Sequence, residues 1–108
     1  MQVTISGKSL AVTNTLREYI ESRVSRLDRF LPNIDEARVD LSVQNSKSAG
    51  DRHTVQLTLR ANGAILRAED RSGDVRTSVD AVMAKMQRQI ERFKGKHWRS
   101  QNRLQARE

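Results

Sequence analysis

The chain has 108 residues, 36% of them hydrophobic, and this length suits one compact domain around a single hydrophobic core. It has no cysteine and no apolar run longer than four residues, which excludes disulfides, thiolate metal sites and a membrane-spanning helix. The net charge is +7, and residues 85–108 supply +6 of it with eight Lys or Arg against two Asp or Glu, a distribution that attracts polyanions such as nucleic acid.

The first third of the chain predicts a strand followed by a helix. Residues 2–6 alternate apolar and polar side chains, as a short strand does. Between residues 16 and 31 the apolar side chains recur at intervals of three and four, which is typical of a helix with one buried stripe. Thr15 has capping-box spacing to the glutamate three residues on, Thr13 is a second candidate for the cap, and Pro32 prevents the helix from continuing.

The middle of the chain predicts three strands, two of which form a hairpin. Residues 37–44 and residues 55–61 alternate apolar and polar side chains, and the small polar segment 45–51 between them predicts a loop. Asn62-Gly63 is a strong signal for a two-residue turn because both residues tolerate positive φ, and residues 64–69 form the returning strand. In this register one face of the hairpin stays apolar. The expected cross-strand pairs are Leu59 with Leu66 and Leu57 with Ala68.

The last predicted element is a helix of about five turns, with apolar residues from Val75 to Phe93 and with Asp74 at its positive end. The order strand, helix, three strands, helix predicts an α+β fold. Specifically, it predicts a two-layer sandwich in which a mostly antiparallel four-stranded sheet carries both helices on one face. This geometry resembles a double-stranded-RNA-binding module, which also lays two helices on a sheet. We place the domain at residues 1–96 and treat residues 97–108 as a basic polar tail.

The basic residues of the second helix are organised. On a wheel of about 100° per residue, seven of them fall within one arc of about 100° that flanks the apolar stripe. These residues are Lys85, Arg88, Arg92, Lys96, Arg99, Arg103 and Arg107. A solvated helix face normally mixes charges, whereas like charges four residues apart repel by roughly 0.2–0.5 kcal/mol per pair, and a phosphate backbone relieves that repulsion. The stripe therefore predicts an RNA-binding surface.

Other residues leave alternatives open. Arg23, Arg26 and Arg29 of the first helix lie among acidic residues, which is typical of ordinary surface charge, but beside the second helix they would widen the basic face. Trp98 either covers the end of the core or stacks on an unpaired base.

Motifs that carry chemistry are absent from the sequence. Neither glycine-rich phosphate-binding pattern occurs. His53 and His97 have no partner at metal-ligand spacing, and the adjacent acids at 35–36 and 69–70 suit strands and turns better than acid–base catalysis. No nucleophile has an evident activating base. We therefore expect no enzyme activity, no cofactor and no metal.

Taken in order, these segments resemble the ribosome hibernation promoting factors and ribosome-associated inhibitors, also called sigma-54 modulation proteins, over nearly the full chain. No single segment is decisive, but their order and spacing together are specific. The features that carry the resemblance are the opening strand running into Gly7-Lys8, VTNTLREYIESRVSRLDRF (12–30), Asn62-Gly63 with Leu66 and Ala68, Asp74, Val79-Asp80 and KMQRQIERFKGK (85–96).

The resemblance implies that the chain binds ribosomal RNA of the small ribosomal subunit at the decoding channel, where messenger and transfer RNA would sit. Translation would then stop by occupancy, and idle ribosomes would be preserved under stress or in stationary phase. It also implies a cytoplasmic location and no membrane partner. The resemblance and the stripe together assign RNA binding to Arg23, Arg26, Lys85, Arg88, Gln89, Arg92, Lys94, Lys96 and Arg99.

Two features depart from the family pattern. The family commonly has an aromatic residue two positions after the aspartate that matches Asp74, and this chain has Arg76 there. Long members continue through a linker into a second domain that pairs two ribosomes, and residues 99–108 have the composition of such a linker. The chain is therefore either a short member or the amino-terminal part of a long one, and we expect dimerisation only with the second domain.

Two other functions stay open on the residues alone. One is a generic module that binds structured RNA, and the other is a protein-binding modulator of transcription. The first predicts similar affinity for any structured RNA, and the second predicts binding to polymerase components with none to ribosomes.

Overall fold

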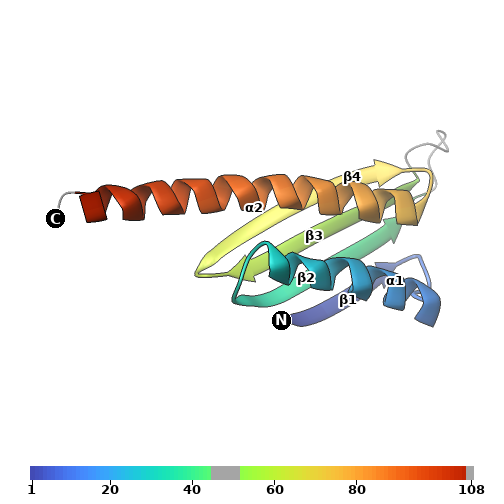
Figure 1. Ribbon diagram of the computed structural model, residues 1–108. Helices are drawn as coiled ribbons and strands as arrows, with labels where there is room; N and C mark the ends of the chain where they lie inside the picture. Colours follow the sequence, from blue (N-terminus) through green and yellow to red (C-terminus); the bar gives the residue numbers. More distant parts are fainter. Residues whose placement is uncertain (45–51, 107–108) are drawn as a thin grey trace.

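The computed structural model describes the backbone of residues 1–44 and 52–106, and the side chains in these ranges as far as Gly95. A sheet forms one layer of the molecule and the helices form the other (Figure 1). In chain order the elements are β1 (Gln2–Lys8), α1 (Asn14–Val24), a short 3-10 helix η1 (Ser25–Arg29), β2 (Ile34–Val43), β3 (His53–Ala61), β4 (Ala64–Ser72) and α2 (Val75–Ala106).

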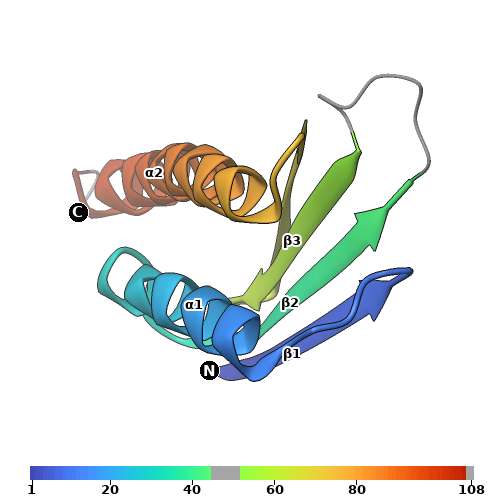
Figure 2. The ribbon, with the colours of Figure 1, turned by 90° about the vertical axis from the view of Figure 1, so that its right-hand side faces the viewer.

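The sheet follows the order of the strands in the chain, β1-β2-β3-β4. β1 pairs with β2 in parallel, and the other two pairs are antiparallel. α1 and η1 provide the long connection that a parallel pair requires. Seen end-on, α1 and α2 lie on the same face of the sheet (Figure 2). These observations confirm the predicted α+β sandwich with a mostly antiparallel four-stranded sheet.

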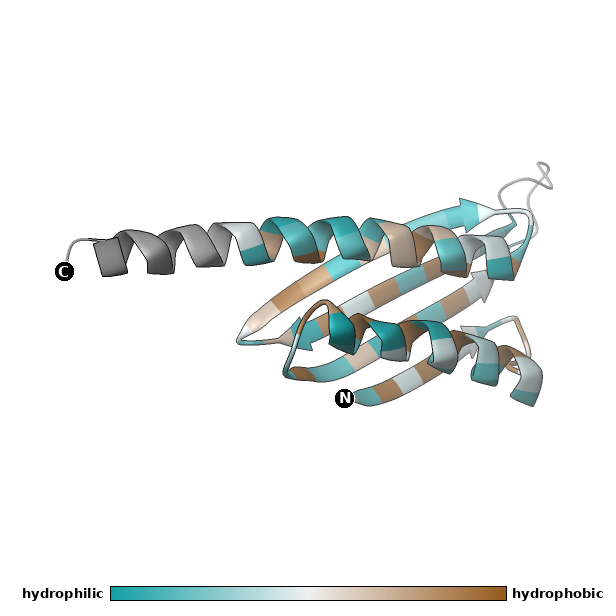
Figure 3. Cartoon of the chain, in the orientation of Figure 1, coloured by the Kyte–Doolittle hydropathy of each residue, from teal (hydrophilic) through white to brown (hydrophobic). Residues whose placement is uncertain are grey.

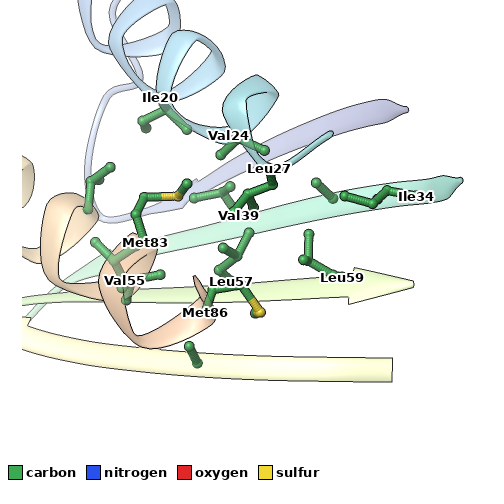
Figure 4. Packing of buried hydrophobic residues seen from close by; sticks show 14 of the residues in the cluster. Ile20, Val24, Leu27, Ile34, Val39, Val55, Leu57, Leu59, Met83 and Met86 are labelled. Carbon is green, nitrogen blue, oxygen red and sulfur yellow. The ribbon is translucent and has the colours of Figure 1, made fainter. Parts of the chain in front are cut away.

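The core lies between the sheet and the two helices, because apolar residues alternate along the strands and recur along one side of each helix (Figure 3). The side chains from the two layers meet in one cluster (Figure 4). Its fully buried members include Ile20, Val24, Leu27, Val39, Leu41, Val55, Leu57, Leu59, Val82, Met86 and Ile90. The alternate positions of the strands, such as Thr58, Arg67 and Arg71, face the opposite side of the sheet and are polar apart from the exposed Ile65.

The β3–β4 hairpin forms as the sequence predicts. Asn62 and Gly63 have φ angles of 53° and 75°, which is the positive range that a two-residue hairpin turn of this type requires. Leu59 pairs with Leu66 and Leu57 pairs with Ala68, so the predicted register is confirmed. β4 continues to Ser72, past the predicted end of the strand.

The first helix differs from the prediction at both ends. Thr13 caps it, because its hydroxyl oxygen accepts a hydrogen bond of 3.2 Å from the backbone N–H of Leu16, so the alternative cap at Thr15 is wrong. The α-helix ends at Val24 and continues as η1, so a single α-helix as far as residue 31 is also wrong. Two serine hydroxyls near this transition donate to carbonyl oxygens three residues back, which favours the tighter turn.

The second helix begins as predicted and is longer than predicted. Asp74 caps it: one carboxylate oxygen accepts from the backbone N–H and from the hydroxyl of Thr77, both at 3.0 Å. The helical backbone continues to Ala106, well past the last apolar residue of the stripe at Phe93, and extends beyond the end of the sheet where β3 and β4 are joined (Figure 1). The division into a domain at residues 1–96 and a tail stays a prediction. Among the described residues, none of the helices is long and apolar enough to cross a membrane.

Candidate nucleic-acid interface

α2 has two flanks, because it lies between α1 on one side and the edge strand β4 on the other (Figures 1 and 2). Side chains of Lys85 and Gln89 reach β4, whereas Asp80 and Lys94 reach α1 and the end of η1. We call these sides the β4 flank and the α1 flank of α2. The predicted RNA-binding residues are divided between them.

On the β4 flank, Lys85 and Gln89 bind the backbone of the edge strand. The Lys85 ammonium donates to the carbonyl oxygen of Glu69 at 2.8 Å and to a carboxylate oxygen of Asp70 at 3.0 Å. The side-chain amide of Gln89 donates to the carbonyl oxygen of Arg67. In this hairpin register the backbone groups of residues 67 and 69 point away from β3, toward the free edge of the sheet.

The spacing of these two contacts explains why they form together. Four residues along a helix advance about 6 Å, and two residues along a strand advance almost the same distance, so Lys85 and Gln89 match alternate carbonyl groups of β4. An exposed edge strand can pair with another chain, and a lysine at the edge is a common protection against that. In the described structure these two residues therefore hold α2 against β4 and cover its edge.

Arg88 and Arg92 stand apart from these contacts. Both side chains are exposed, and neither forms an ion pair within the part of the chain whose side chains are described. The Nε of Arg92 donates to the carbonyl oxygen of Arg88 at 3.5 Å. Because they lie one turn apart on a helix anchored in the core, they present two guanidinium groups to solvent from a rigid support.

A hollow of about 430 Å³ opens beside Arg92. Its walls are Leu66 of β4 and Gln89, Arg92 and Phe93 of α2, so two apolar side chains and two polar side chains surround it. It places apolar surface next to a guanidinium group that has no carboxylate partner among the described residues.

On the α1 flank, Lys94 joins α2 to the end of η1. Its ammonium group donates to the carbonyl oxygen of Phe30 at 2.7 Å. That carbonyl follows the last turn of η1, where backbone oxygens lack helical partners and a cation is favourable. Lys94 is partly buried, and it has a structural contact as well as a charge.

Arg23 also lies on the α1 flank and is engaged with α2. Its Nε lies 3.5 Å from a carboxylate oxygen of Asp80, and its guanidinium carbon lies 4.6 Å from the centre of the Tyr19 ring. Hydrogen bonding by Tyr19, followed by the interaction with the Asp80 carboxylate, raises the pKa of Arg23 above its ordinary value. Arg26, one turn further on, is exposed and forms no ion pair within the described residues.

The remaining predicted residues, Lys96 and Arg99, lie outside the described side chains, as do His97 and Trp98. The RNA-binding assignment of all nine residues stays a prediction. The structure brings Arg88 and Arg92 together without an ion pair among the described residues, and it gives Lys85, Gln89, Lys94 and Arg23 contacts with other elements. Tyr19 and Asp80 are partners that the sequence reasoning missed, and the available signal was that each lies four residues from an arginine on its own helix.

Comparisons with known proteins agree with this fold. The Deinococcus radiodurans protein named ribosome hibernation promotion factor is 36% identical over 93 residues, which are 86% of this chain and 49% of that protein. The Azotobacter vinelandii protein named ribosome hibernation promoting factor is 34% identical over 96 residues, which are 89% of this chain and 85% of that protein. A Picosynechococcus protein, also named ribosome hibernation promotion factor, is 31% identical over 106 residues, which are 97% of this chain and 55% of that protein. The chain thus spans about half the length of the Deinococcus and Picosynechococcus proteins.

Solved structures support the same grouping. The crystal structure of the Thermus thermophilus Protein Y N-terminal domain matches with a TM-score of 0.74 at 25% identity, covering 86% of this chain and 99% of that one. A ribosomal subunit interface protein from Coxiella burnetii shares the fold with a TM-score of 0.74 at 20% identity, covering 88% of this chain and 99% of that one. The family described as Sigma 54 modulation protein / S30EA ribosomal protein matches residues 3–98. The chain belongs to this family.

Proposed function

We propose that the chain binds ribosomal RNA of the small ribosomal subunit at the decoding channel and thereby stops translation in idle ribosomes. The observation that carries this proposal is the pair of exposed guanidinium groups, Arg88 and Arg92, which form no ion pair within the described residues. They lie on a core-anchored helix of a family whose relatives are named ribosome hibernation factors. A cytoplasmic location follows, because ribosomes are there.

Phosphate contacts would supply the affinity. A guanidinium group that replaces counterions on a phosphate backbone gains free energy that does not depend on base sequence. α2 is already held in place by its apolar core residues and by the contacts of Lys85, Gln89 and Lys94. We therefore expect that little conformational entropy is lost when Arg88 and Arg92 bind RNA. Arg26, Lys96 and Arg99 are further proposed contacts. The inhibition would come from occupying the channel, with no chemical step.

The hollow beside Arg92 gives the surface a second kind of contact. An unpaired base could place its face against Leu66 while its phosphate meets Arg92. Contacts of this kind between bases and apolar or aromatic side chains tolerate any base, so they fit a protein that reads shape and charge.

A ribosome pelleting assay tests the proposal. The chain should sediment with purified small subunits, and messenger RNA with initiator transfer RNA should displace it. The double variant Arg88→Glu/Arg92→Glu should lose sedimentation while keeping the melting temperature, because both side chains are exposed. The matched control is Arg67→Glu/Arg71→Glu, which makes the same charge change on the opposite face of the sheet and should still sediment.

Other outcomes point to the alternatives. Equal affinity for an unrelated structured RNA and for small subunits would favour a generic RNA-binding module. Binding to polymerase components with none to ribosomes would favour a modulator of transcription. Failure of the unmodified chain to sediment with small subunits at low salt would overturn the proposal.

A further inference from the structure

The side chain of Tyr19 on α1 has two guanidinium groups against its ring. The guanidinium carbon of Arg23 lies 4.6 Å from the ring centre, and that of Arg76, in the first turn of α2, lies 4.9 Å from it. The two guanidinium groups are therefore no further apart than the sum of these distances. Residues from both helices meet at this one ring.

The cluster has more positive than negative charge. Its carboxylate is that of Asp80, one oxygen of which accepts from the Tyr19 hydroxyl at 2.7 Å and lies 3.5 Å from the Arg23 Nε. Arg76 is exposed and forms no ion pair within the described part of the chain. Arg23 is thus ion-paired with Asp80, whereas Arg76 has no ion pair there and its charge acts at longer range on the Asp74 carboxylate, whose pKa it helps to lower.

The way the two arginines are held suits phosphate binding. A guanidinium group that stacks on an aromatic ring is attracted to the ring face, and its N–H groups remain free at the rim. Stacking also restricts the side chain before a ligand arrives, so less ordering is needed when a phosphate binds.

The position of the cluster extends the surface already described. Twelve residues separate Arg76 from Arg88, which is about 18 Å along the axis of α2. The cluster lies on the α1 flank near the beginning of α2, and Arg26 lies one turn beyond Arg23. Twelve residues also turn the helix by about 120°, so Arg76 and Arg88 lie on different sides of α2, and RNA that wraps around the helix would meet both.

We propose that Arg76 and Arg23, held against Tyr19, form a second phosphate-binding position for RNA, and that a phosphate takes the place of Asp80 at Arg23. This inference rests on the proposed function, because the RNA is that of the small ribosomal subunit. Asp80 keeps Arg23 in place in the free protein. A backbone phosphodiester of RNA offers the same kind of acceptor with the same single negative charge, and an RNA strand also brings further phosphates to the neighbouring cations.

The test compares variants of the full chain for binding to purified small ribosomal subunits at about 50 mM and about 200 mM salt. Arg76→Gln should weaken binding by about three- to tenfold and reduce the slope of log affinity against log salt by about one. Arg76→Tyr, which replaces the guanidinium group by a neutral side chain of similar size, should show the same loss. Arg71→Gln removes an exposed arginine from the opposite face of the sheet and should change neither quantity.

Two further variants examine the mechanism. Asp80→Asn keeps an acceptor for the Tyr19 hydroxyl but removes the negative charge, so it should tighten binding; weaker binding would overturn the exchange at Arg23. Tyr19→Leu removes the ring and should weaken binding as Arg76→Gln does, with the melting temperature of each variant measured to exclude unfolding.

The failure of this inference is distinct from the failure of the proposed function. If Arg76→Gln binds with unchanged affinity and salt slope while Arg88→Glu/Arg92→Glu loses binding, the second position is overturned and the proposed function stands. If the unmodified chain does not bind small subunits at about 50 mM salt, both are overturned.

Discussion

The ammonium group of Lys85 lies 3.0 Å from a carboxylate oxygen of Asp70, although 15 residues separate them in the chain. This ion pair is partly shielded, since the Asp70 side chain is only 19% exposed. Together with the contact from Gln89 to the backbone of Arg67, it joins α2 to the edge of the sheet. Lys85, which the sequence analysis assigned to RNA binding, therefore has a structural contact in the folded protein. This contact leads to different predictions for Lys85 and for the nearby Arg88.

Replacing both edge contacts should loosen α2 from β4. The variant Lys85→Met/Gln89→Met should lower the free energy of unfolding by about 1–2 kcal/mol, because two hydrogen bonds and one ion pair are lost. It should also self-associate more readily, because the edge of β4 becomes available to another chain. Urea unfolding and analytical ultracentrifugation measure these effects. Arg88→Met is the matched control and should change neither the free energy of unfolding nor self-association. Equal destabilisation by the two variants would contradict the role of Lys85 and Gln89 in holding α2 against β4.

The salt dependence of binding to small subunits should separate phosphate contacts from structural contacts. Arg88→Gln should reduce the slope of log affinity against log salt by about 0.7–0.9, the amount expected for one lost phosphate contact. Lys85→Gln should leave the slope almost unchanged, since its ammonium is already engaged with Glu69 and Asp70. The measurement is a binding titration at several salt concentrations. Equal slope changes for the two variants would show that Lys85 leaves β4 to bind RNA.

The cap of α2 should make stability depend on pH in the acidic range. Hydrogen bonds from Thr77, backbone first and side chain second, hold the pKa of Asp74 below its ordinary value of 3.8. The carboxylate therefore stabilises the fold fully above that value, and its contribution is lost as pH falls through the lower pKa of the folded state. The uncharged variant Asp74→Asn should melt a few degrees lower than the unmodified chain at neutral pH.

The difference between these two proteins should shrink as the pH is lowered below the ordinary aspartate value, because the unmodified cap then becomes neutral as well. Thermal melting followed by circular dichroism from neutral to acidic pH measures this. A difference in melting temperature that stays constant over the whole range would rule out the charged cap as its source.

Two glycines should respond in opposite ways to alanine. A β-carbon at Gly7 would lie 2.5 Å from the carbonyl oxygen of Leu10 and 2.9 Å from a methyl group of Val12, so Gly7→Ala should destabilise the fold by about 1–3 kcal/mol. At Gly95 an added β-carbon meets nothing within 4 Å, and the residue lies inside α2. Gly95→Ala should therefore stabilise the fold by up to about 1 kcal/mol. Chemical denaturation of both variants checks the pair.

Local patterns in the sequence were sufficient for the elements and for much of their arrangement. The alternation in β2, β3 and β4 and the apolar stripe of α2 depend on backbone geometry that repeats within a few residues. Asn62-Gly63 determines the hairpin register because the turn itself selects which residues face each other, and Asp74 caps α2 through a contact only three residues long. The end of α1 was harder, because the competition between α and 3-10 geometry near Ser25 depends on small differences in side-chain hydrogen bonding.

The tertiary structure alone decided which of the described cations of the basic stripe are engaged: Lys85 contacts β4, whereas Arg88 and Arg92 form no ion pair among the described residues. A helical wheel gives the direction of each side chain around α2 but not its neighbour, so Lys85 and Arg88 look equivalent in the sequence. The contacts that distinguish the predicted cations join residues that are distant in the sequence. Lys85 and Asp70 are 15 residues apart, and Lys94 and Phe30 are 64 residues apart. The hydrogen bond between Tyr19 and Asp80 joins residues that are 61 apart. Such contacts arise because the sheet and the helices share one core, which brings distant segments of the chain side by side.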